Sequence, residues 1–356
     1  MITIFTPSFA DAANTNAQNL TVKEIVARLD PERFRVQMLY ISAPDERIQK
    51  RSNTELIRYR RRGNTARLLL PALKADLYFF PREGPLEAAF IFLSRALRRK
   101  TALVTYIVAT QDYRPIPRAI TRSVMEADAV VGNSAFVSET VAQTFGRTAS
   151  TIHSGIRREW YYPPGEPRSA VNSRKLVVLY AGTFQARKRV EIVIEEAAKR
   201  PEVEFRLAGA GEEEASCRAL ASRLNCPNVH FLGHLAGPIL GEEMRGADIF
   251  LFPSRLEGHP QVLGQAAACG LPCIARDVYH PDYVVNGETG FLVTSEAEIP
   301  AKLDLLLTQP DLRQSMSKAA VQHSQRFEWG PTVKLWEELF DAVVARRRTK
   351  GRGERY

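Results

Sequence analysis

Short apolar runs alternate with amphipathic stretches along most of the chain, and this pattern predicts buried strands separated by helices. In the first half, the expected strands are Ile2–Phe5, Arg35–Ile41, Asp76–Pro81, Ala102–Ala109, Ala129–Gly132 and Ala149–Ser154. The pattern restarts at Lys175, with strands expected at Leu176–Ala181, Val203–Ala208, Val229–Leu232, Ile249–Phe252, Cys273–Ala275 and Phe291–Val293. Strands that alternate with helices pair in parallel, so the pattern predicts an α/β fold with two Rossmann-like, doubly wound parallel sheets.

A chain of 356 residues exceeds what one hydrophobic core usually supports, so two domains are expected. The boundary is placed after residue 165, within Arg157–Arg168, whose prolines and charges are typical of a linker. The expected domains are therefore residues 1–165 and 166–328. The last amphipathic pattern, Trp329–Val344, predicts a helix long enough to pack across both domains, so residues 329–356 form this crossing helix and a basic tail.

The composition indicates which broad class of protein the chain belongs to. With 45% apolar and 25% charged residues, the chain is an ordinary globular one. No run approaches the ~18 apolar residues that span a bilayer, and Met1–Pro7 is too short for the apolar region of a signal peptide. The four cysteines show no Cys-x-x-Cys spacing, so neither a disulfide framework nor a zinc site is expected. These features predict a cytoplasmic protein.

The formal net charge of +9 is unevenly distributed, because residues 43–100 contain 14 Lys/Arg against 6 Asp/Glu. Further basic residues gather in the tail, Arg346–Arg352. Such runs usually form solvated faces. The alternative is a surface that meets an anionic membrane or a phosphate-bearing acceptor, each basic residue near a membrane contributing about 1 kcal/mol, and it predicts a peripheral location at the inner face of the membrane. No nucleic-acid partner is expected, because no recognised binding motif accompanies the charge.

One loop combines a carboxylate with the start of a helix. The expected strand Ile249–Phe252 leads into Glu257, and the apolar spacing after Pro260 predicts a helix whose first turn tolerates this proline. The first N–H groups of this helix, those of Gln261 and Val262, would face the crevice beyond the strand, where an anionic phosphate is well held. The carboxylate of Glu257 suits the hydroxyls of a sugar or ribose.

The stretch Glu257-Gly-His-Pro-Gln-Val-Leu-Gly-Gln265, followed by Ala-Ala-Ala-Cys-Gly-Leu-Pro272, resembles the signature of the family 4 retaining glycosyltransferases, a group 1 family with the GT-B fold. The resemblance implies two Rossmann-like domains that face each other across a cleft, with Glu257 orienting the donor sugar. The family has a second Glu where this chain has Gln265, which keeps a hydrogen-bonding group for the ribose but loses the charge. His259 would hydrogen-bond a donor hydroxyl, and the alternative is an exposed loop histidine with no role.

A second loop, Gly182–Arg189, follows the first strand of the second sheet and resembles the phosphate-binding loop of the same family. The resemblance implies that Gly182 opens the donor site, and that Arg187 and Lys188 hold the diphosphate, whose negative charge grows as the sugar departs. The alternative is the solvated start of a helix, which the helix dipole disfavours because it opposes cations at this end. Arg189 is expected to be exposed.

The nucleotide base is expected beside Phe231, Leu232 and Gly233, because the corresponding segment of the family passes its backbone near the base. The N-terminal half resembles the family less. The loop after its first strand lacks the family's paired glycines and offers Asn16, which would bind phosphate or an acceptor hydroxyl, or else cap a helix. Asp112 is a candidate contact for the acceptor.

The resemblance implies a retaining hexosyltransferase that takes a sugar from a nucleotide-diphosphate donor, with no metal or other cofactor. The expected acceptor is a glycan or a lipid-linked molecule in cell-envelope polysaccharide synthesis, which the basic N-terminal half favours. One alternative is a catalytically silent member that binds a nucleotide sugar or glycan and acts as a partner subunit, which Gln265 slightly favours. Another alternative, a nucleotide-sugar epimerase, would need an acid/base set that the sequence does not reveal.

Overall fold

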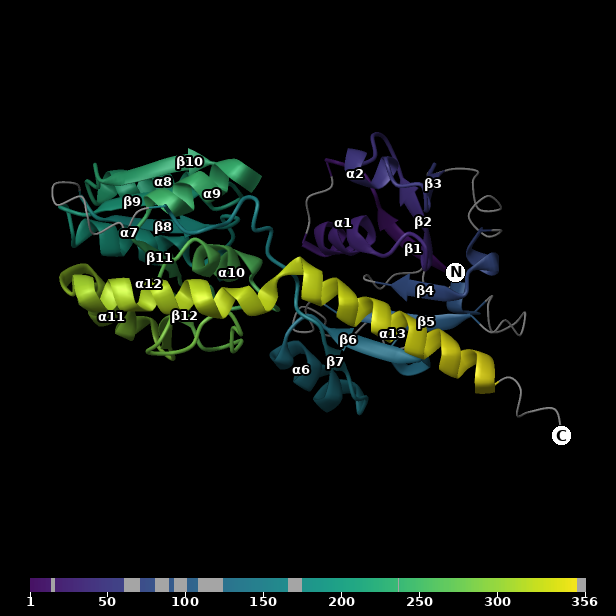
Figure 1. The fold of residues 1–356 in the computed structure, drawn as a ribbon. Coiled ribbons are helices and arrows are strands. Elements are labelled where there is room, and N and C mark those ends of the chain that lie inside the picture. The colour runs from purple at the N-terminus through teal and green to yellow at the C-terminus, as the bar shows by residue number, and fades with distance from the viewer. Residues whose placement is uncertain are drawn as a thin grey trace. The chain divides into compact units, whose positions relative to one another are not determined.

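The computed structural model describes residues 1–13, 17–60, 71–80, 90–92, 101–107, 124–165, 175–235 and 237–350, except for the side chains of residues 17, 18 and 350. The chain divides into two compact units, which we call unit 1 (Met1–Gly155 with Trp329–Tyr356) and unit 2 (Ile156–Glu328). Each unit contains one parallel sheet with helices packed on it (Figure 1). The predicted α/β class with two Rossmann-like parallel sheets is confirmed.

The sheet of unit 1 has the strand order β3-β2-β1-β4-β5-β6-β7. Its strands are β1 (Ile2–Phe9), β2 (Phe34–Tyr40), β3 (Thr54–Arg58), β4 (Leu77–Phe80), β5 (Ala102–Ile107), β6 (Ala129–Gly132) and β7 (Ser150–Thr151). The chain winds outward in one direction from β1 to β3 and in the other from β4 to β7. Such a reversal of direction, here between β1 and β4, is where doubly wound sheets open a crevice beyond their carboxyl ends.

The edge strand β3 was not predicted from the sequence. It pairs in parallel with β2, from Val36 opposite Thr54 to Tyr40 opposite Arg58. Its residues are only half-buried or exposed, because an edge strand has one neighbour. The sequence Thr-Glu-Leu-Ile-Arg therefore lacks the continuous apolar run by which the central strands were recognised.

Among the residues that the structure describes, the helices of unit 1 include α1 (Ala17–Arg28), α2 (Glu46–Gln49), α6 (Ala135–Phe145) and α13 (Trp329–Lys350). The last of these supplies apolar side chains to the core of unit 1, where Trp336 packs against Phe79 and Tyr106 at ring-centroid distances of 5.0 and 5.2 Å. It lies beside α1 and β5 (Figure 1). The helix predicted at Trp329–Val344 is therefore present and extends to Lys350. Its contacts assign it to unit 1.

The sheet of unit 2 has the order β10-β9-β8-β11-β12-β13. Its strands are β8 (Val177–Ala181), β9 (Glu204–Ala208), β10 (Val229–Gly233), β11 (Ile249–Phe252), β12 (Cys273–Arg276) and β13 (Gly290–Val293). Its α-helices are α7 (Val190–Ala198), α8 (Glu214–Arg223), α9 (Gly237–Gly246), α10 (Gln261–Ala268), α11 (Ile299–Thr308) and α12 (Pro310–Ser324), with short 3-10 turns η2 (Ala186–Lys188), η3 (Glu296–Glu298) and η4 (Gln325–Phe327). The direction of winding reverses between β8 and β11, so the crevice of this sheet is expected there.

Unit 2 begins earlier than the predicted boundary after residue 165. Ile156 pairs with Glu328 in a parallel bridge, and Tyr161 is buried. The guanidinium of Arg157 lies 3.9 Å from the ring centroid of Trp160. The expectation of a linker is therefore wrong for residues 157–165, which pack into unit 2, while residues 166–168 lie outside the described ranges.

Within the described ranges, no helix combines the length and the hydropathy that a membrane crossing requires. All four cysteines are buried and free, as their isolated spacing predicts.

Candidate active site

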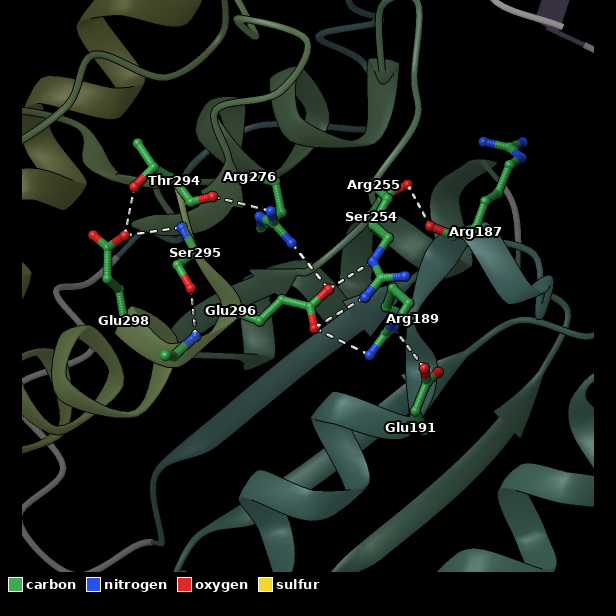
Figure 2. A network of polar contacts seen from close by, with 11 residues as sticks. Arg187, Arg189, Glu191, Ser254, Arg255, Arg276, Thr294, Ser295, Glu296 and Glu298 are labelled. Carbon is green, nitrogen blue, oxygen red and sulfur yellow. Dashed lines mark hydrogen bonds and ion pairs between the residues drawn. The ribbon is translucent and has the colours of Figure 1, made fainter.

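Two loops meet where the winding of unit 2 reverses. One follows β8 and carries Arg187, and the other follows the neighbouring strand β11 and carries Ser254 and Arg255. The carbonyl oxygen of Arg187 accepts hydrogen bonds from the backbone N–H of Arg255, at 2.9 Å, and from the Ser254 hydroxyl, at 3.3 Å. The second of these bonds is drawn in Figure 2. The backbone thus joins the two loops directly, although they lie far apart in the sequence.

The structure brings Arg187, Lys188 and Glu257 together. One carboxylate oxygen, Oε1 of Glu257, accepts hydrogen bonds from Arg187 Nη1 at 3.0 Å and from Lys188 Nζ at 2.5 Å. The same oxygen accepts a hydrogen bond from Ser254 Oγ at 2.6 Å. Arg187 Nη1 also donates to the Leu256 carbonyl at 2.7 Å. Two cations and a carboxylate therefore share one small polar site at the carboxyl ends of β8 and β11.

Lys188 is the buried member of this cluster. It is only 8% exposed, and its Nζ lies 5.0 Å from the ring centroid of Phe252. Burial lowers the pKa of Lys188, and the charge of Glu257 opposes this by favouring the ammonium form. Arg187 is more accessible, with a side chain that is 40% exposed. The site thus offers one desolvated cation and one that solvent still reaches.

The loop reaches this arrangement through a turn at Arg189. The 3-10 turn η2 ends there with φ 56° and ψ 43°, and α7 begins at the next residue. Lys188 contacts Glu257, whereas Arg189 pairs with Glu191 at 2.6 Å and with Glu296 at 3.0 Å. The expectation that Arg189 is exposed is wrong, because these ion pairs leave its side chain only 20% exposed.

The helix α10 begins where the sequence predicts, with Pro260 as its N-cap and Gln261 and Val262 as its first residues. Helix geometry leaves the first N–H groups of such a helix without carbonyl partners inside the helix. Gln265 is half-buried and lies one turn after Gln261, so the two side chains are on the same face. One face of the helix therefore carries two amide side chains, Gln261 at its N-terminal end and Gln265 one turn later.

His259 is buried rather than exposed. None of its side chain is accessible to solvent, its ring stacks on Tyr283 at a centroid distance of 4.2 Å, and its Nδ1 lies 3.9 Å from the Asp282 carboxylate. The alternative of an exposed loop histidine is therefore wrong. A hydrogen bond from His259 to a donor hydroxyl stays a prediction.

Three glycines end the neighbouring strands β8, β9 and β10. The N–H of Gly209 donates to the Gly233 carbonyl at 2.7 Å, and the N–H of Gly182 donates to the Ala208 carbonyl at 2.9 Å. A Cβ atom on Gly209 would lie 1.9 Å from the carbonyl oxygen of Gly182, so no larger residue fits there. The backbones that follow β8 and β9 therefore approach each other closely at Gly182 and Gly209.

The segment predicted to meet the base is half-buried along its length, at Phe231, Leu232 and Gly233. Phe231 lies between the ring of Phe184, at 6.2 Å, and the guanidinium of Arg218, at 4.4 Å from the ring centroid. Gly233 has φ 70°, a conformation that glycine adopts without strain. The structure therefore places this segment at the same sheet end as Gly182.

Two candidates of the N-terminal half, Asn16 and Asp112, lie outside the described residues. Among the residues that are described, no group of three or more His, Cys, Asp or Glu side chains is arranged to hold a metal ion.

Two features of the site were not predicted from the sequence. Ser254 was not singled out from the sequence, although it lies only three residues before Glu257, whose carboxylate it contacts. The pairing of Arg189, Arg255 and Arg276 with Glu296 joins residues that are far apart in the chain, and no local pattern indicates it.

Comparison with known proteins agrees with this geometry. Residues 166–323 match the family model "Glycosyl transferases group 1". D-inositol 3-phosphate glycosyltransferase of Kribbella flavida is 31% identical over 204 residues, which cover 51% of this chain and 48% of the relative. The chain spans about half the length of the curated relatives it matches.

Solved structures show the same architecture over nearly the whole chain. Sucrose-phosphate synthase from Thermosynechococcus elongatus superposes with a TM-score of 0.77 at 20% identity, covering 97% of this chain and 100% of that one. HepE of Anabaena, solved in complex with UDP, superposes with a TM-score of 0.79 at 18% identity, covering 96% and 100%. The chain has the GT-B fold, and its residues 166–323 are similar to the glycosyl transferases group 1 family.

Proposed function

We propose that the chain is a retaining glycosyltransferase that moves a hexose from a nucleoside-diphosphate sugar to a glycan or lipid-linked acceptor. The observation that carries the proposal is the cluster of Arg187, Lys188 and Glu257 at the point where the winding of unit 2 reverses. Ligands of open parallel sheets bind at this point, beyond the carboxyl ends of the strands. HepE of Anabaena, a neighbour in fold, was solved with UDP bound.

In this proposal the diphosphate of the donor takes the place of Glu257 as the partner of the two cations. A phosphate oxygen near Lys188 would meet a cation that is already desolvated, so their attraction is stronger than in water. Arg187 presents a planar guanidinium that suits two phosphate oxygens at once. As the bond between sugar and diphosphate breaks, both cations stabilise the growing negative charge.

The remaining residues position the donor. Glu257, held by the hydroxyl of Ser254, accepts a hydrogen bond from a sugar hydroxyl, and the amide of Gln265 contacts the ribose. The first N–H groups of α10, at Gln261 and Val262, face the phosphate or sugar, as helix N-termini do for anions. His259 would support the sugar site from behind, because its ring is buried against Tyr283.

The proposed reaction proceeds with retention of the anomeric configuration. The leaving diphosphate helps to take the proton of the acceptor hydroxyl on the same face of the sugar, so no resident metal or other cofactor takes part. Catalysis then consists mainly of positioning and of charge stabilisation by Arg187 and Lys188.

The proposed acceptor belongs to cell-envelope polysaccharide synthesis, and the proposed location is the cytoplasm or the inner face of the membrane. The support is the excess of Lys and Arg among residues 43–100, of which Arg58 and Arg60 are described and exposed. Basic side chains of this kind attract anionic headgroups and phosphate-bearing acceptors.

A catalytically silent member that binds nucleotide sugars is the second candidate. The observation that favours it is the uncharged Gln265, at the position where the family carries Glu. Such a protein would bind the donor through the same cations but would release no nucleoside diphosphate.

The test is a screen of the purified chain against the sugar diphosphates of uridine, guanosine, adenosine and thymidine, with and without membrane glycolipid extract. An active transferase is stabilised against heat by one donor and releases its nucleoside diphosphate when the extract is present. Nuclear magnetic resonance of the product then reports the anomeric configuration, and inversion would contradict the retaining assignment. Stabilisation without release supports the silent member, and no response to any donor contradicts both.

A further inference from the structure

Beside the candidate active site, one carboxylate collects three guanidinium groups. Glu296 accepts from Arg189 Nη2 at 3.0 Å, from Arg255 Nε at 2.8 Å and from Arg276 Nη1 at 2.9 Å. Figure 2 shows the three side chains converging on Glu296, while the side chain of Arg187 points away from it. The carboxylate of Glu296 therefore pairs with neither Arg187 nor Lys188, the two cations of the donor site.

The three arginines come from three different segments of unit 2. Arg189 directly follows Lys188 in the loop after β8. Arg255 lies between Ser254 and Glu257 in the loop after β11. Arg276 ends β12, and Glu296 itself begins η3. One carboxylate thus connects both loops of the candidate active site to the neighbouring strand of the sheet.

We propose that Glu296 is a positioning residue for the donor site, which fixes the loops of Lys188 and Glu257 relative to each other. The inference rests on the proposed function, because it assigns Glu296 a part in the same site. Glu296 acts through Arg189 and Arg255 and contacts no substrate.

The conformation of Arg189 shows why such a restraint is needed. Its φ of 56° lies in the left-handed region, which is unfavourable for a residue other than glycine. The turn at Arg189 sends this side chain toward Glu296 and the preceding one, Lys188, toward Glu257. The ion pairs of Arg189 with Glu296 and Glu191 offset the cost of the turn, and by holding the turn they hold Lys188 at Glu257.

The opposite loop is held at two places. The backbone N–H of Arg255 donates to the Arg187 carbonyl, and the side chain of Arg255 pairs with Glu296. Without Glu296, three guanidinium groups would face one another with no shared anion, and their repulsion would push the loops apart. The hydrogen bond between the N–H of Arg255 and the carbonyl of Arg187 is then the first to open.

Three variants separate this role from ordinary stabilisation of unit 2. Glu296→Gln removes the shared charge. Arg255→Gln releases only the loop of Glu257, and because the Arg255 side chain is 54% exposed this variant folds even where Glu296→Gln does not. Glu298→Gln is the matched control, since Glu298 lies in the same 3-10 turn but bonds to Thr294 and Ser295 and, among the described residues, to none of the three arginines.

The first measurement is hydrogen–deuterium exchange of residues 253–258, which requires no ligand. We expect Glu296→Gln and Arg255→Gln to speed exchange at the N–H of Arg255 about tenfold, and Glu298→Gln to leave it unchanged. Equal exchange in the wild type and in the folded Glu296 or Arg255 variant would overturn the inference, whatever the chain binds.

The second measurement is the Kd for UDP, by calorimetric titration. Glu296→Gln and Arg255→Gln should each weaken UDP binding about tenfold. Glu298→Gln should bind UDP as tightly as the wild type does. Faster exchange with unchanged UDP affinity would show that Glu296 orders the loops without positioning the donor site, and would also overturn the inference. If the wild type does not bind UDP, the proposed function fails for this donor, while the exchange result still decides whether Glu296 holds the loops.

Discussion

The two cations of the candidate active site share one carboxylate as their partner. Arg187 and Lys188 both hydrogen-bond to the carboxylate of Glu257, which also keeps the buried ammonium of Lys188 from being left without a counter-charge. A diphosphate must therefore compete with Glu257 for the two cations. At the residue scale, Glu257 thus competes with the nucleotide for Arg187 and Lys188. For sugar transfer, by contrast, the carboxylate and the two cations act together.

This opposition predicts the behaviour of Glu257→Gln. The variant keeps a hydrogen-bonding side chain but removes the competing charge, so the Kd for the nucleoside diphosphate should stay unchanged or fall. Sugar transfer should fall about a hundredfold, because the donor sugar loses the carboxylate that orients it. The check is to measure, on one preparation, the Kd by titration calorimetry and the rate of sugar transfer by the release of nucleoside diphosphate. Weaker nucleotide binding together with unchanged transfer would contradict the assigned role.

Gln265 is tested by restoring the residue of the family signature. Gln265→Glu keeps the hydrogen-bond acceptor and adds a charge to a half-buried position on α10. We expect donor binding to be retained and kcat/KM to change less than about threefold, or to rise. Loss of donor binding in a folded variant would show that this side chain does not contact the ribose.

The members of the donor cluster could be predicted from the sequence, but their mutual contacts could not. The signature around Glu257 and the loop with Arg187 and Lys188 each follow a buried strand, so parallel pairing predicts that they meet at one edge of the sheet. The turn at Arg189 depends instead on ion pairs with Glu296, a residue far along the chain. For this reason Arg189 was wrongly expected to be exposed.

At the element scale, the central strands carry the strongest sequence signal. The strands β6 and β11 have the predicted bounds, because each is a short, continuous apolar run buried on both faces. The edge strand β3 escaped prediction because only Leu56 and Ile57 of its five residues are apolar, which is neither a continuous apolar run nor a regular alternation. Local sequence therefore identifies most of the strands, while β3 is decided by its pairing with β2.

The contact of η3 with both donor loops predicts a specific acid dependence. Burial tends to raise the pKa of Glu296, but the hydrogen bond from Arg255 and the charges of Arg189, Arg255 and Arg276 outweigh it and lower the pKa below the usual value of 4.5. A carboxylate with a lowered folded pKa contributes stability that is fully present above the unfolded pKa and is lost as the pH falls through the folded value.

The wild type should therefore be more stable than Glu296→Gln at pH 7, and the difference should shrink as the pH falls below about 4.5. Thermal midpoints of the two proteins between pH 7 and pH 3 provide the comparison. A difference that stays constant down to pH 3 would show that Glu296 contributes no charge-dependent stability.

At the scale of the whole molecule, one compact unit is built from two separate segments of the chain and the other from a single segment. Unit 1 begins and ends the chain, because α13 returns to its core, while unit 2 is one continuous segment. The candidate donor residues described in the structure all belong to unit 2. Stability of unit 1 and nucleotide binding by unit 2 should therefore respond to different substitutions.

Trp336→Ala tests this separation. Trp336 is fully buried against Phe79, Tyr106 and Phe340, so its truncation should destabilise unit 1 by about 3–5 kcal/mol. The affinity for nucleoside diphosphate should match the wild type at temperatures where the variant is folded. The control is Leu335→Ala on the same helix, where the side chain is 49% exposed. Equal unfolding of the two variants would contradict the assignment of α13 to the core of unit 1.

Prediction from the sequence ends at the loops of unit 1 that we propose for recognition of the acceptor. Acceptor contacts are expected from loops at the carboxyl ends of β1 and β4, where the winding of unit 1 reverses. The sequence of these loops departs from the family pattern, and Asn16 and Asp112 lie outside the described residues. Recognition of an acceptor depends on side chains from several separate loops, so no single stretch of sequence identifies it.

The most direct test of the account is the binding of UDP, GDP, ADP and dTDP to the wild type and to Lys188→Ala, measured by calorimetric titration. The account predicts that the wild type binds at least one of them and that Lys188→Ala weakens this binding about tenfold or more, because a buried, charge-assisted hydrogen bond is lost. Lys199→Ala, at an exposed lysine of unit 2, should bind as the wild type does. Equal affinity of the wild type and Lys188→Ala, or no binding of any nucleotide by the wild type, would contradict the assignment of the site.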